Sequence, residues 1–457
     1  MPEELNKKCI RDAVYLSTRL LLATALMRAA LLPLLFLAQP LAAAPAVCDA
    51  VTACRAPADN RTDAAPALSA CVAPGGPCSA PGSTLSLAAR AAFRISSLDL
   101  SHTVNLTLSW AAGSGLYAIA EPALYPLQPQ LPPSNMPQLG QQFRAVLFAR
   151  NASGLTLEGP ASALLDGAGA AWWANASRLP HQRPKLVEVV DSSDVTVRGL
   201  TFSNSPFWSL HAVYCARVSF LGVTVLAPRA IGNTDGVDAS SCTDVTIDSC
   251  HIDVGDDGIS IKSDWRVDPA TGAATLLPTA RVLVRNTTVL SRNIAIGSSC
   301  FGNITDVRIE GGRIGDDYGS SPWAFKVKTH VPLGGVVANV TVAGTAIGSI
   351  APNSWQQPSG GAAFHVEIAP YNSPAIPPGV TPAATRFVGI ALVDLSVRSA
   401  VAGGDFTAEA PFAVENLTLS GVRFGRITGR GPPWACKRVH GLVAQGVVPP
   451  LPPNCFA

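Results

Sequence analysis

Three acidic residues at the centre of the chain have the types and spacing needed for acid/base chemistry. Asp235 lies in Asn233-Thr-Asp-Gly-Val-Asp238, and Asp256 and Asp257 lie in Val254-Gly-Asp-Asp-Gly-Ile-Ser-Ile-Lys-Ser263. Only 14% of the 457 residues are charged, so carboxylates gathered on one surface would be unusual. Clustered carboxylates suggest a general acid and a general base.

Basic residues follow the acids at similar intervals along the chain. Asp235 and Asp256 are followed by Arg292 and then by Lys326, each about one structural repeat further on. We therefore expect these four positions to form a column on one outer face of the protein. Such a column, with Lys328 beside it, would suit a chain-like anionic substrate.

The same sequence words also have a purely structural interpretation. Asp-Gly and Gly-Asp-Asp-Gly form turns, and a repetitive fold needs turns whether or not they carry chemistry. A second such word, Gly315-Asp-Asp317, precedes Pro322 and has no partner acid one repeat earlier. We interpret that second word as a solvated turn.

A repeated pattern indicates the architecture that must position these residues. A short alternating strand, a turn and a second short strand recur throughout the chain. The copies are Val195–Phe202, Val218–Val225, Val245–Ile252, Val307–Ile314, Val340–Ile347 and Leu417–Phe424, with weaker ones near Leu155, Val282 and Ile390. Stacked parallel turns would bury a continuous apolar column, which predicts an all-β parallel β-helix in a single domain. A β-sandwich is the alternative, but it would favour Asn-Gly or Asp-Gly hairpins, which are scarce here.

The two ends of the chain have different compositions from the centre. Arg19 and Arg28, an apolar run and Ala42-Ala-Ala44 give residues 1–44 the layout of a secretory signal, or of an uncleaved anchor. Residues 45–430 then form the β-helix domain. Residues 431–457 are a Pro-rich tail that we expect to cover the last turn.

Cysteines and glycosylation sequons support a secreted protein. Outside the signal there are ten cysteines, which predict disulfides within an N-terminal group of four and between Cys436 and Cys455. Sequons occur at Asn60, Asn151, Asn175, Asn303 and Asn416. The net charge of +2 gives no support to nucleic-acid binding. We expect a glycosylated extracellular monomer, with no membrane partner unless the signal is retained, and neither a cofactor nor a metal.

Several motifs together resemble the polygalacturonase-like pectin hydrolases of glycoside hydrolase family 28. Their order and rough spacing match the family from about Asp59 to Phe424. They are Asn233-Thr-Asp-Gly, Gly255-Asp-Asp-Gly, Ile296-Gly-Ser298 and Lys326-Val-Lys-Thr329, supported by Asp59-Asn-Arg-Thr-Asp63, Leu164-Leu-Asp-Gly-Ala-Gly169 and Asn204-Ser-Pro-Phe-Trp208 with His211.

The resemblance implies a right-handed parallel β-helix that hydrolyses α-1,4-galacturonosyl linkages of pectin with inversion, outside the cell or in the cell wall. It implies that Asp256 is the general acid and that Asp235 and Asp257 position and deprotonate the water. We predict that Lys326, Lys328, Arg292, Asn233 and Tyr371 bind the substrate, with Lys328 and Tyr371 in roles that the resemblance implies.

Two departures from the family pattern keep alternatives open. The family's Gly-His-Gly is replaced by Ser291-Arg-Asn293, so its histidine is absent, and the arginine of its Arg-Ile-Lys is Lys326. Arg292 could replace part of the histidine's role by pairing with one acid, or it could be an exposed surface residue. The alternatives are a hydrolase of branched pectin, of rhamnogalacturonan or xylogalacturonan type, and a weakened β-helix protein that only binds cell-wall polysaccharide.

Overall fold

A computed structural model describes residues 44–133, 140–268, 270–319, 321–329, 334–352, 361–368, 379–380 and 385–456. The predicted signal segment therefore lies almost wholly outside the described residues. Pro45–Ala457 form one compact unit, which contains all the elements described below.

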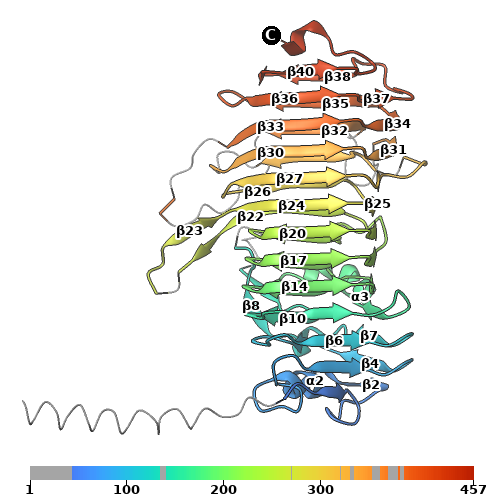
Figure 1. Cartoon of the computed structure of the whole chain (residues 1–457), viewed down its shortest axis with the longest axis vertical. Helices are drawn as coiled ribbons and strands as arrows, with labels where there is room; N and C mark the ends of the chain where they lie inside the picture. Colours follow the sequence, from blue (N-terminus) through green and yellow to red (C-terminus); the bar gives the residue numbers. More distant parts are fainter. Residues whose placement is uncertain are drawn as a thin grey trace, which may run out of the picture. The chain divides into compact units, whose positions relative to one another are not determined.

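The chain winds into a parallel β-helix with three sheets (Figure 1). Sheet 1 contains β1 (Val47–Asp49), β3 (Thr84–Leu87), β6 (Thr107–Trp110), β11 (Thr156–Glu158), β14 (Ser193–Arg198), β17 (Ala216–Leu221), β20 (Thr243–Asp248), β24 (Thr279–Arg285), β27 (Ile304–Glu310), β30 (Val336–Ala343), β33 (Arg386–Val393), β36 (Val414–Ser420), β39 (Val439–His440) and β40 (Val443–Gln445).

Sheet 2 contains β2 (Asp59–Asp63), β4 (Ala92–Ile95), β7 (Gly115–Ala118), β12 (Leu164–Asp166), β15 (Thr201–Ser203), β18 (Thr224–Leu226), β21 (His251–Asp253), β25 (Thr288–Val289), β28 (Arg313–Ile314), β31 (Ala346–Ile350), β34 (Ser396–Ala400) and β37 (Arg423–Phe424).

Sheet 3 contains β5 (Leu98–Asp99), β10 (Leu147–Arg150), β13 (Val187–Val190), β16 (Leu210–Val213), β19 (Val237–Ser240), β22 (Ile259–Val267), β26 (Ile294–Cys300), β29 (Phe325–Thr329), β32 (Ala362–Ile368), β35 (Ala402–Ala408) and β38 (Trp434–Lys437), with β23 (Ala274–Leu277) antiparallel to β22. Short helices lie between strands: α2 (Ala65–Val72), α3 (Gly169–Ala174), η1 (Pro122–Leu124), η3 (Ala176–Arg178) and η4 (Pro453–Phe456).

The strand–turn–strand repeat predicted from the sequence corresponds to sheets 1 and 2. In each copy the first strand belongs to sheet 1 and the second to sheet 2, as in β17 and β18 or β36 and β37. Neighbouring turns are in parallel register, so equivalent residues stack, as Val218 does on Val245 and Val245 on Val282. The prediction of a parallel β-helix is therefore confirmed.

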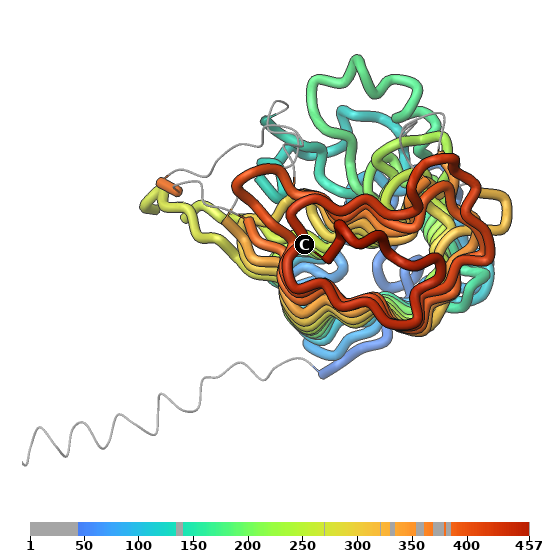
Figure 2. The backbone as a smooth tube through the Cα atoms, turned by 90° about the horizontal axis from the view of Figure 1, so that it is seen from above, coloured from blue at the N-terminus to red at the C-terminus, as the bar shows by residue number. Residues whose placement is uncertain are grey.

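The core is a column of apolar side chains inside the coil. Figure 2 looks along this column and shows successive turns superimposed around one axis. Val218, Val245, Val307 and Val340 are at most 1% exposed, and each comes from a different turn of sheet 1. The alternation of strand residues sends their polar neighbours outward.

Both ends of the coil carry disulfides. Cys48–Cys78 and Cys54–Cys71 surround α2, which packs near β5, and Cys436–Cys455 joins β38 to η4. All three bonds fall within the predicted groups. The Pro-rich tail contributes β38 to sheet 3 and β39 and β40 to sheet 1, so it continues the coil beyond β35 and β36.

Four further cysteines are free and buried: Cys215, Cys242, Cys250 and Cys300. Their thiols lie inside the coil, where they pack as small apolar groups. The even number of cysteines outside the signal therefore does not mean that all of them are paired.

Stability should depend on the inner column much more than on the outer surface. Ile261 is fully buried on β22 and stacks between Ala239 and Ile296, so Ile261→Ala should lower the free energy of unfolding by about 2–5 kcal/mol. Leu226→Ala on β18, where the side chain is 37% exposed, is the control and should cost much less. Chemical denaturation of both variants measures the difference; equal losses would contradict this description of the core.

Candidate active site

The three acidic residues lie together just before the N-terminal ends of two neighbouring strands of sheet 3. Asp235 precedes β19, and Asp256 and Asp257 precede β22. Because Val237 pairs with Ile259, Asp235 and Asp257 occupy equivalent positions in successive turns. One carboxylate oxygen from each of the three residues lies within 4.8 Å of the others, and all three residues are buried.

The glycines that follow these acids are required by the close stacking of the turns. A Cβ on Gly236 would lie 2.4 Å from the carbonyl oxygen of Gly258, and a Cβ on Gly258 would lie 2.2 Å from Ser291 Oγ. Real Cβ atoms do not approach other atoms so closely. The Asp-Gly motifs therefore serve the fold as well as the site. The glycine allows the next turn to approach closely, and the preceding aspartate reaches the outer face.

Asp256 accepts three polar contacts. Its Oδ2 accepts a hydrogen bond from the Asn233 backbone N–H at 2.7 Å, and its Oδ1 accepts one from the Asp257 backbone N–H at 2.9 Å. Arg292 Nη1 lies 2.9 Å from the same Oδ1. Burial and the neighbouring charge of Asp257 nevertheless raise the pKa of Asp256, while Arg292 opposes that rise.

The position of Arg292 bears on the choice that the sequence left open. The Arg292 side chain is 15% exposed and forms the ion pair with Asp256. The Arg292 backbone N–H also donates to the carbonyl oxygen of Asp256 at 3.2 Å. Arg292 is thus a partner of one acid and not an exposed surface residue.

Asp257 is held in its ionised form by two donors. Lys328 Nζ lies 3.1 Å from its Oδ2, and Asn293 Nδ2 donates to its Oδ1 at 3.1 Å. Burial alone would raise the pKa of Asp257, but the charges of Lys328 and Arg292 outweigh it and lower the pKa below its usual range. Two adjacent residues, Asp256 and Asp257, therefore have pKa values shifted in opposite directions.

Asp235 is the least supported of the three carboxylates. Lys262 Nζ lies 3.9 Å from its Oδ2, and its Oδ1 is buried without a hydrogen-bond partner among the described residues. Burial, together with the charges of Asp238 and Asp256, raises the pKa of Asp235 well above its usual range. This carboxyl group binds a proton more readily than an exposed aspartate does.

Sequence reasoning missed the residues that support Asp235. Lys262 Nζ lies 2.5 Å from Asp238 Oδ1 and 3.6 Å from the centroid of the Trp208 ring. Both charged residues stand within the two motifs that drew attention to the acids, at the outward positions of β19 and β22. Strand alternation counted from the inward-facing Val237 and Ile261 could have identified them.

The register corrects the predicted column of acids and bases. Lys326 pairs with Ala295 on one side and with His365 on the other. Since Ala295 comes three residues after Arg292, Lys326 does not stack on Arg292, which precedes β26. The cause is that β29 begins at Phe325, immediately before Lys326, whereas Arg292 lies two residues before its own strand. Lys326 Nζ instead lies 3.9 Å from the Trp323 ring centroid, and burial lowers the pKa of this lysine to about 8.

Two of the three remaining residues that were predicted to bind substrate contact the acids. Asn233 contacts Asp256 through its backbone, and Lys328 contacts Asp257, so both lie within the acid cluster. Tyr371 lies outside the described residues.

The segment Gly315-Asp-Asp317 bends after β28 and Asp317 is exposed, as predicted, but both acids are engaged in ion pairs that the sequence did not reveal. Asp316 forms an ion pair with Arg229 at 2.6 Å, and Arg229 also contacts Asp253 at 2.5 Å. Asp317 pairs with Arg313 and Arg398. Arg229 and Arg398 come from other turns of the coil, whereas Arg313 lies only four residues before Asp317.

Comparisons with known proteins agree with this architecture. The family model of Glycosyl hydrolases family 28 matches residues 138–353, which contain all three acids. A probable polygalacturonase from Vitis vinifera is 28% identical over 67% of this chain and 60% of its own length. A polygalacturonase from Chamaecyparis obtusa is 35% identical over 21% of each chain. The chain thus spans less than two thirds of the length of these relatives.

Solved structures of low sequence identity share the fold. An exopolygalacturonase from Thermotoga maritima has a TM-score of 0.62 at 18% identity, covering 88% of this chain and 92% of that one. An endo-xylogalacturonan hydrolase from Aspergillus tubingensis has a TM-score of 0.61 at 19% identity, covering 90% and 98%. Among the described residues, no helix has the length and apolar character needed to cross a membrane.

The comparisons therefore agree on the fold and on a partial family match. The chain is similar to Glycosyl hydrolases family 28 over residues 138–353, and it is folded as a right-handed parallel β-helix.

Proposed function

We propose that this chain is a secreted hydrolase that cleaves α-1,4-galacturonosyl linkages of pectin by acid/base catalysis. The observation that carries the proposal is the opposite shift of pKa in two adjacent carboxyl groups. Asp256 has a raised pKa and can hold a proton, whereas Asp257 has a lowered pKa and stays ionised. Glycoside hydrolysis needs one carboxyl group in each state.

In this mechanism Asp256 protonates the oxygen of the leaving sugar, and Asp257 removes a proton from the attacking water. Asp235 shares the same oxygen-lined space and orients the water by a further hydrogen bond. The three groups interact strongly, so their titration belongs to the cluster as a whole. Arg292 and Lys328 hold the acid and the base in place.

The spacing of the acids bears on the stereochemistry that the resemblance implies. Inverting enzymes generally keep the acid and base carboxyl groups about 6.5–9.5 Å apart to admit a water. The value of 4.8 Å is an upper limit on the distances among one oxygen from each of the three carboxylates. It is not the distance between the carboxyl groups of the acid and the base. We retain inversion as part of the proposal, and the anomeric form of the first product, observed by proton NMR, tests it directly.

The acid cluster has the geometry of a possible cation site, but its surroundings favour catalysis without a metal. Asp257 already contacts Lys328 and Asn293, Asp256 contacts Arg292, and Asp235 lies near Lys262. A divalent cation would meet the repulsion of these positive side chains. We therefore propose a metal-independent hydrolase whose activity survives a chelator.

A second candidate, a hydrolase of branched or esterified pectin, is favoured by charges on the next turns. His365, one register step beyond Lys326, lies 3.0 Å from Glu367 and 3.4 Å from Asp405. Burial alone would lower the pKa of His365, but its contacts with Asp405 and Glu367 raise it. The carboxylates of Glu367 and Asp405 would repel a galacturonate carboxylate at this position. Lys326 and Lys328, on the preceding turn, would attract it.

The location and assembly of the protein are also part of the proposal. The signal-like segment at residues 1–44, the disulfides and the exposed sequon asparagines such as Asn151 support an extracellular, glycosylated protein that acts on cell-wall polysaccharide. We propose that it acts as a monomer, because one chain supplies all the acids and bases described above.

Loss of the proposed general acid should abolish cleavage while preserving binding. Asp256→Asn should lower kcat by about 10²–10⁴-fold, because an amide keeps the shape but donates no proton of comparable acidity. Release of reducing ends from polygalacturonan and from branched pectin measures this, and Asp244→Asn, in an exposed ion pair on β20, is the control. Binding of both substrates without cleavage by the parent protein would instead support the weakened binding protein.

The pH profile should respond differently to the two cations of the site. Lys328→Ala removes the largest charge that lowers the pKa of Asp257, so the base should protonate at higher pH and the acidic limb of kcat/KM should move upward. Arg292→Ala removes the charge that most strongly opposes the raised pKa of Asp256, so the acid should stay protonated to higher pH and the alkaline limb should move upward. The acidic limb should also move upward, but less than in Lys328→Ala, because Arg292 contributes less than Lys328 to the lowered pKa of Asp257. Lys328→Arg and Arg292→Lys keep the charge and should shift each limb less. A shift of the alkaline limb alone in Lys328→Ala would reverse the assigned roles.

Lys326 and Glu367 should have opposite effects on charged substrates. Lys326→Met should lower kcat/KM on de-esterified galacturonan by roughly tenfold or more, the usual value of a hydrogen bond to a charged group, and should affect methyl-esterified pectin less. Glu367→Gln should raise the preference for the de-esterified substrate, because it removes a negative charge one turn further on. Kinetics at low and high salt check both effects, and losses that are equal on both substrates would mean that these residues only support the fold.

A further inference from the structure

The outer face of sheet 3 carries the proposed site on some turns and a covering hairpin on others. The acids and lysines of the proposed site lie between β19 and β29. On the N-terminal side, β10, β13 and β16 present the same outer face, but a hairpin lies over it. That hairpin is formed by β8 (Leu127–Pro129) and β9 (Gln141–Phe143), which pair in antiparallel fashion. In Figure 2 the teal chain of this region lies outside the outline of the stacked turns.

Apolar packing seals the hairpin onto the sheet. Leu131, which follows β8, packs against a separate buried cluster that includes Phe148, Val190 and Val213. These three residues come from β10, β13 and β16 and point away from the interior of the coil. The outer face of these turns is therefore covered with apolar contacts and is not available to a sugar.

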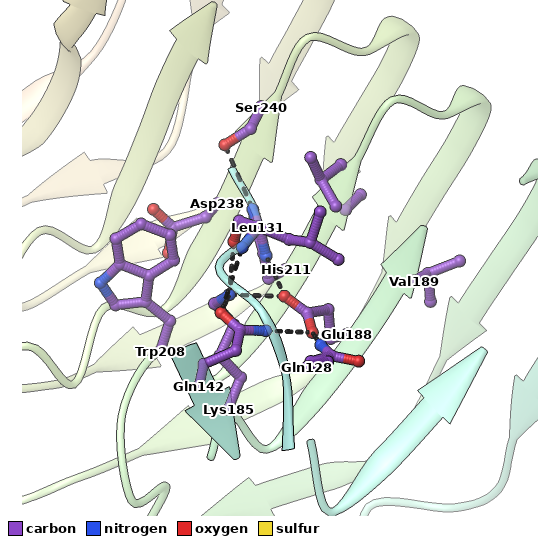
Figure 3. Close-up of polar contacts among 12 residues, drawn as sticks. Gln128, Leu131, Gln142, Lys185, Glu188, Val189, Trp208, His211, Asp238 and Ser240 are labelled. Carbon is purple, nitrogen blue, oxygen red and sulfur yellow. Dashed lines mark hydrogen bonds and ion pairs between the residues drawn. The ribbon is translucent and has the colours of Figure 1, made fainter. Parts of the chain in front are cut away.

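A buried polar network fastens the hairpin at its centre (Figure 3). Gln128 Nε2 and Gln142 Nε2, one from each hairpin strand, both donate to Glu188 Oε2 at 2.9 Å. Lys185 Nζ lies 2.5 Å from Glu188 Oε1 and donates to the carbonyl of Leu131 at 2.7 Å and to Gln142 Oε1 at 3.1 Å. Glu188 belongs to β13, so the network ties the hairpin directly to the sheet.

The charges in this network make the attachment strong. Glu188 and Lys185 are at most 1% exposed, and the removal of one partner would leave a buried charge uncompensated. Burial alone would raise the pKa of Glu188, but Lys185 and His211 lower it to about 2. The carboxylate therefore stays ionised, and the hairpin stays fastened, across the mildly acidic and neutral range.

The covered part begins close to the proposed site. Glu188 pairs with His211 and His211 with Asp238, so Glu188 lies two turns, or about 10 Å, from Asp238. The Trp208 ring lies between the two regions, with Lys185 Nζ 5.3 Å and Lys262 Nζ 3.6 Å from its centroid. A polysaccharide lying along sheet 3 across the acids meets the hairpin after a short run of sugars.

We infer that this hairpin is a fixed wall that restricts the protein to attack near one end of its polysaccharide chain. The inference rests on the proposed hydrolysis of pectin and specifies its mode. The end of the sugar chain lies toward the wall when a linkage near that end meets the acids, and one short product of constant length is released at each cleavage. A sugar chain that continues in both directions cannot lie across the acids.

The first test uses the unmodified protein on long de-esterified polygalacturonan. Viscosity and reducing ends are measured together, and the products are separated by anion-exchange chromatography. We expect a slow fall in viscosity for each reducing end formed, and one short product from the earliest time point. A rapid fall in viscosity with products of many lengths would overturn the wall while leaving the hydrolase intact, whereas the absence of any reducing ends from any pectin would overturn the proposed function itself.

The second test loosens the wall without touching the acids. Gln128→Ala combined with Gln142→Ala removes both amide donors to Glu188 and leaves the pair with Lys185 in place. We expect longer products and at least a severalfold greater loss of viscosity for each reducing end. Leu127→Ala is the matched control, because Leu127 is 44% exposed on the same hairpin and should leave the products unchanged. Thermal unfolding confirms that both variants fold, and an unchanged product profile in a folded double variant would contradict the fastening role of the glutamines.

Discussion

In-register stacking of the turns is the constraint on which the rest of this structure depends. Each strand pairs with equivalent residues of the turns before and after it, so a residue's height along the axis and its inward or outward direction are fixed together. A slip of one residue in β22 would turn Lys262 inward and expose Ile261. The apolar column therefore does more than stabilise the coil. It determines which polar side chains can meet on the outside.

The acid cluster shows how the coil tolerates charges that are buried together. Three aspartates whose oxygens lie within 4.8 Å would repel one another strongly if all were ionised. Arg292, Lys328 and Lys262 each approach a different aspartate, and the remaining imbalance appears as the raised pKa of Asp235 and Asp256. The same arrangement that limits repulsion leaves Asp256, with a raised pKa, directly beside Asp257, with a lowered one.

The sequence predicted the coil and the acids better than it predicted their partners. Alternating strands such as Val245–Ile252 repeat visibly, so sheets 1 and 2 could be identified from spacing. The strands of sheet 3 follow loops of variable length, and the place of Lys326 in the register depends on where β29 begins. Ion pairs such as Asp316 with Arg229 join residues 87 positions apart, and the sequence pattern does not encode which turns meet.

The acid cluster and the network that fastens the hairpin meet at one aromatic ring, so the two regions lie close together. Lys185 and Lys262 both lie over Trp208, and each is also paired with an acid, Glu188 in the wall and Asp238 beside the site. His211 lies between them, with Nδ1 3.2 Å from Glu188 and Nε2 3.2 Å from Ser240. Burial and the charge of Lys185 lower the pKa of His211 to about 3, so the ring is neutral and can donate from one nitrogen and accept at the other. A neutral histidine at this point joins Glu188 to Ser240 on β19 by hydrogen bonds without adding a third cation beside the two lysines.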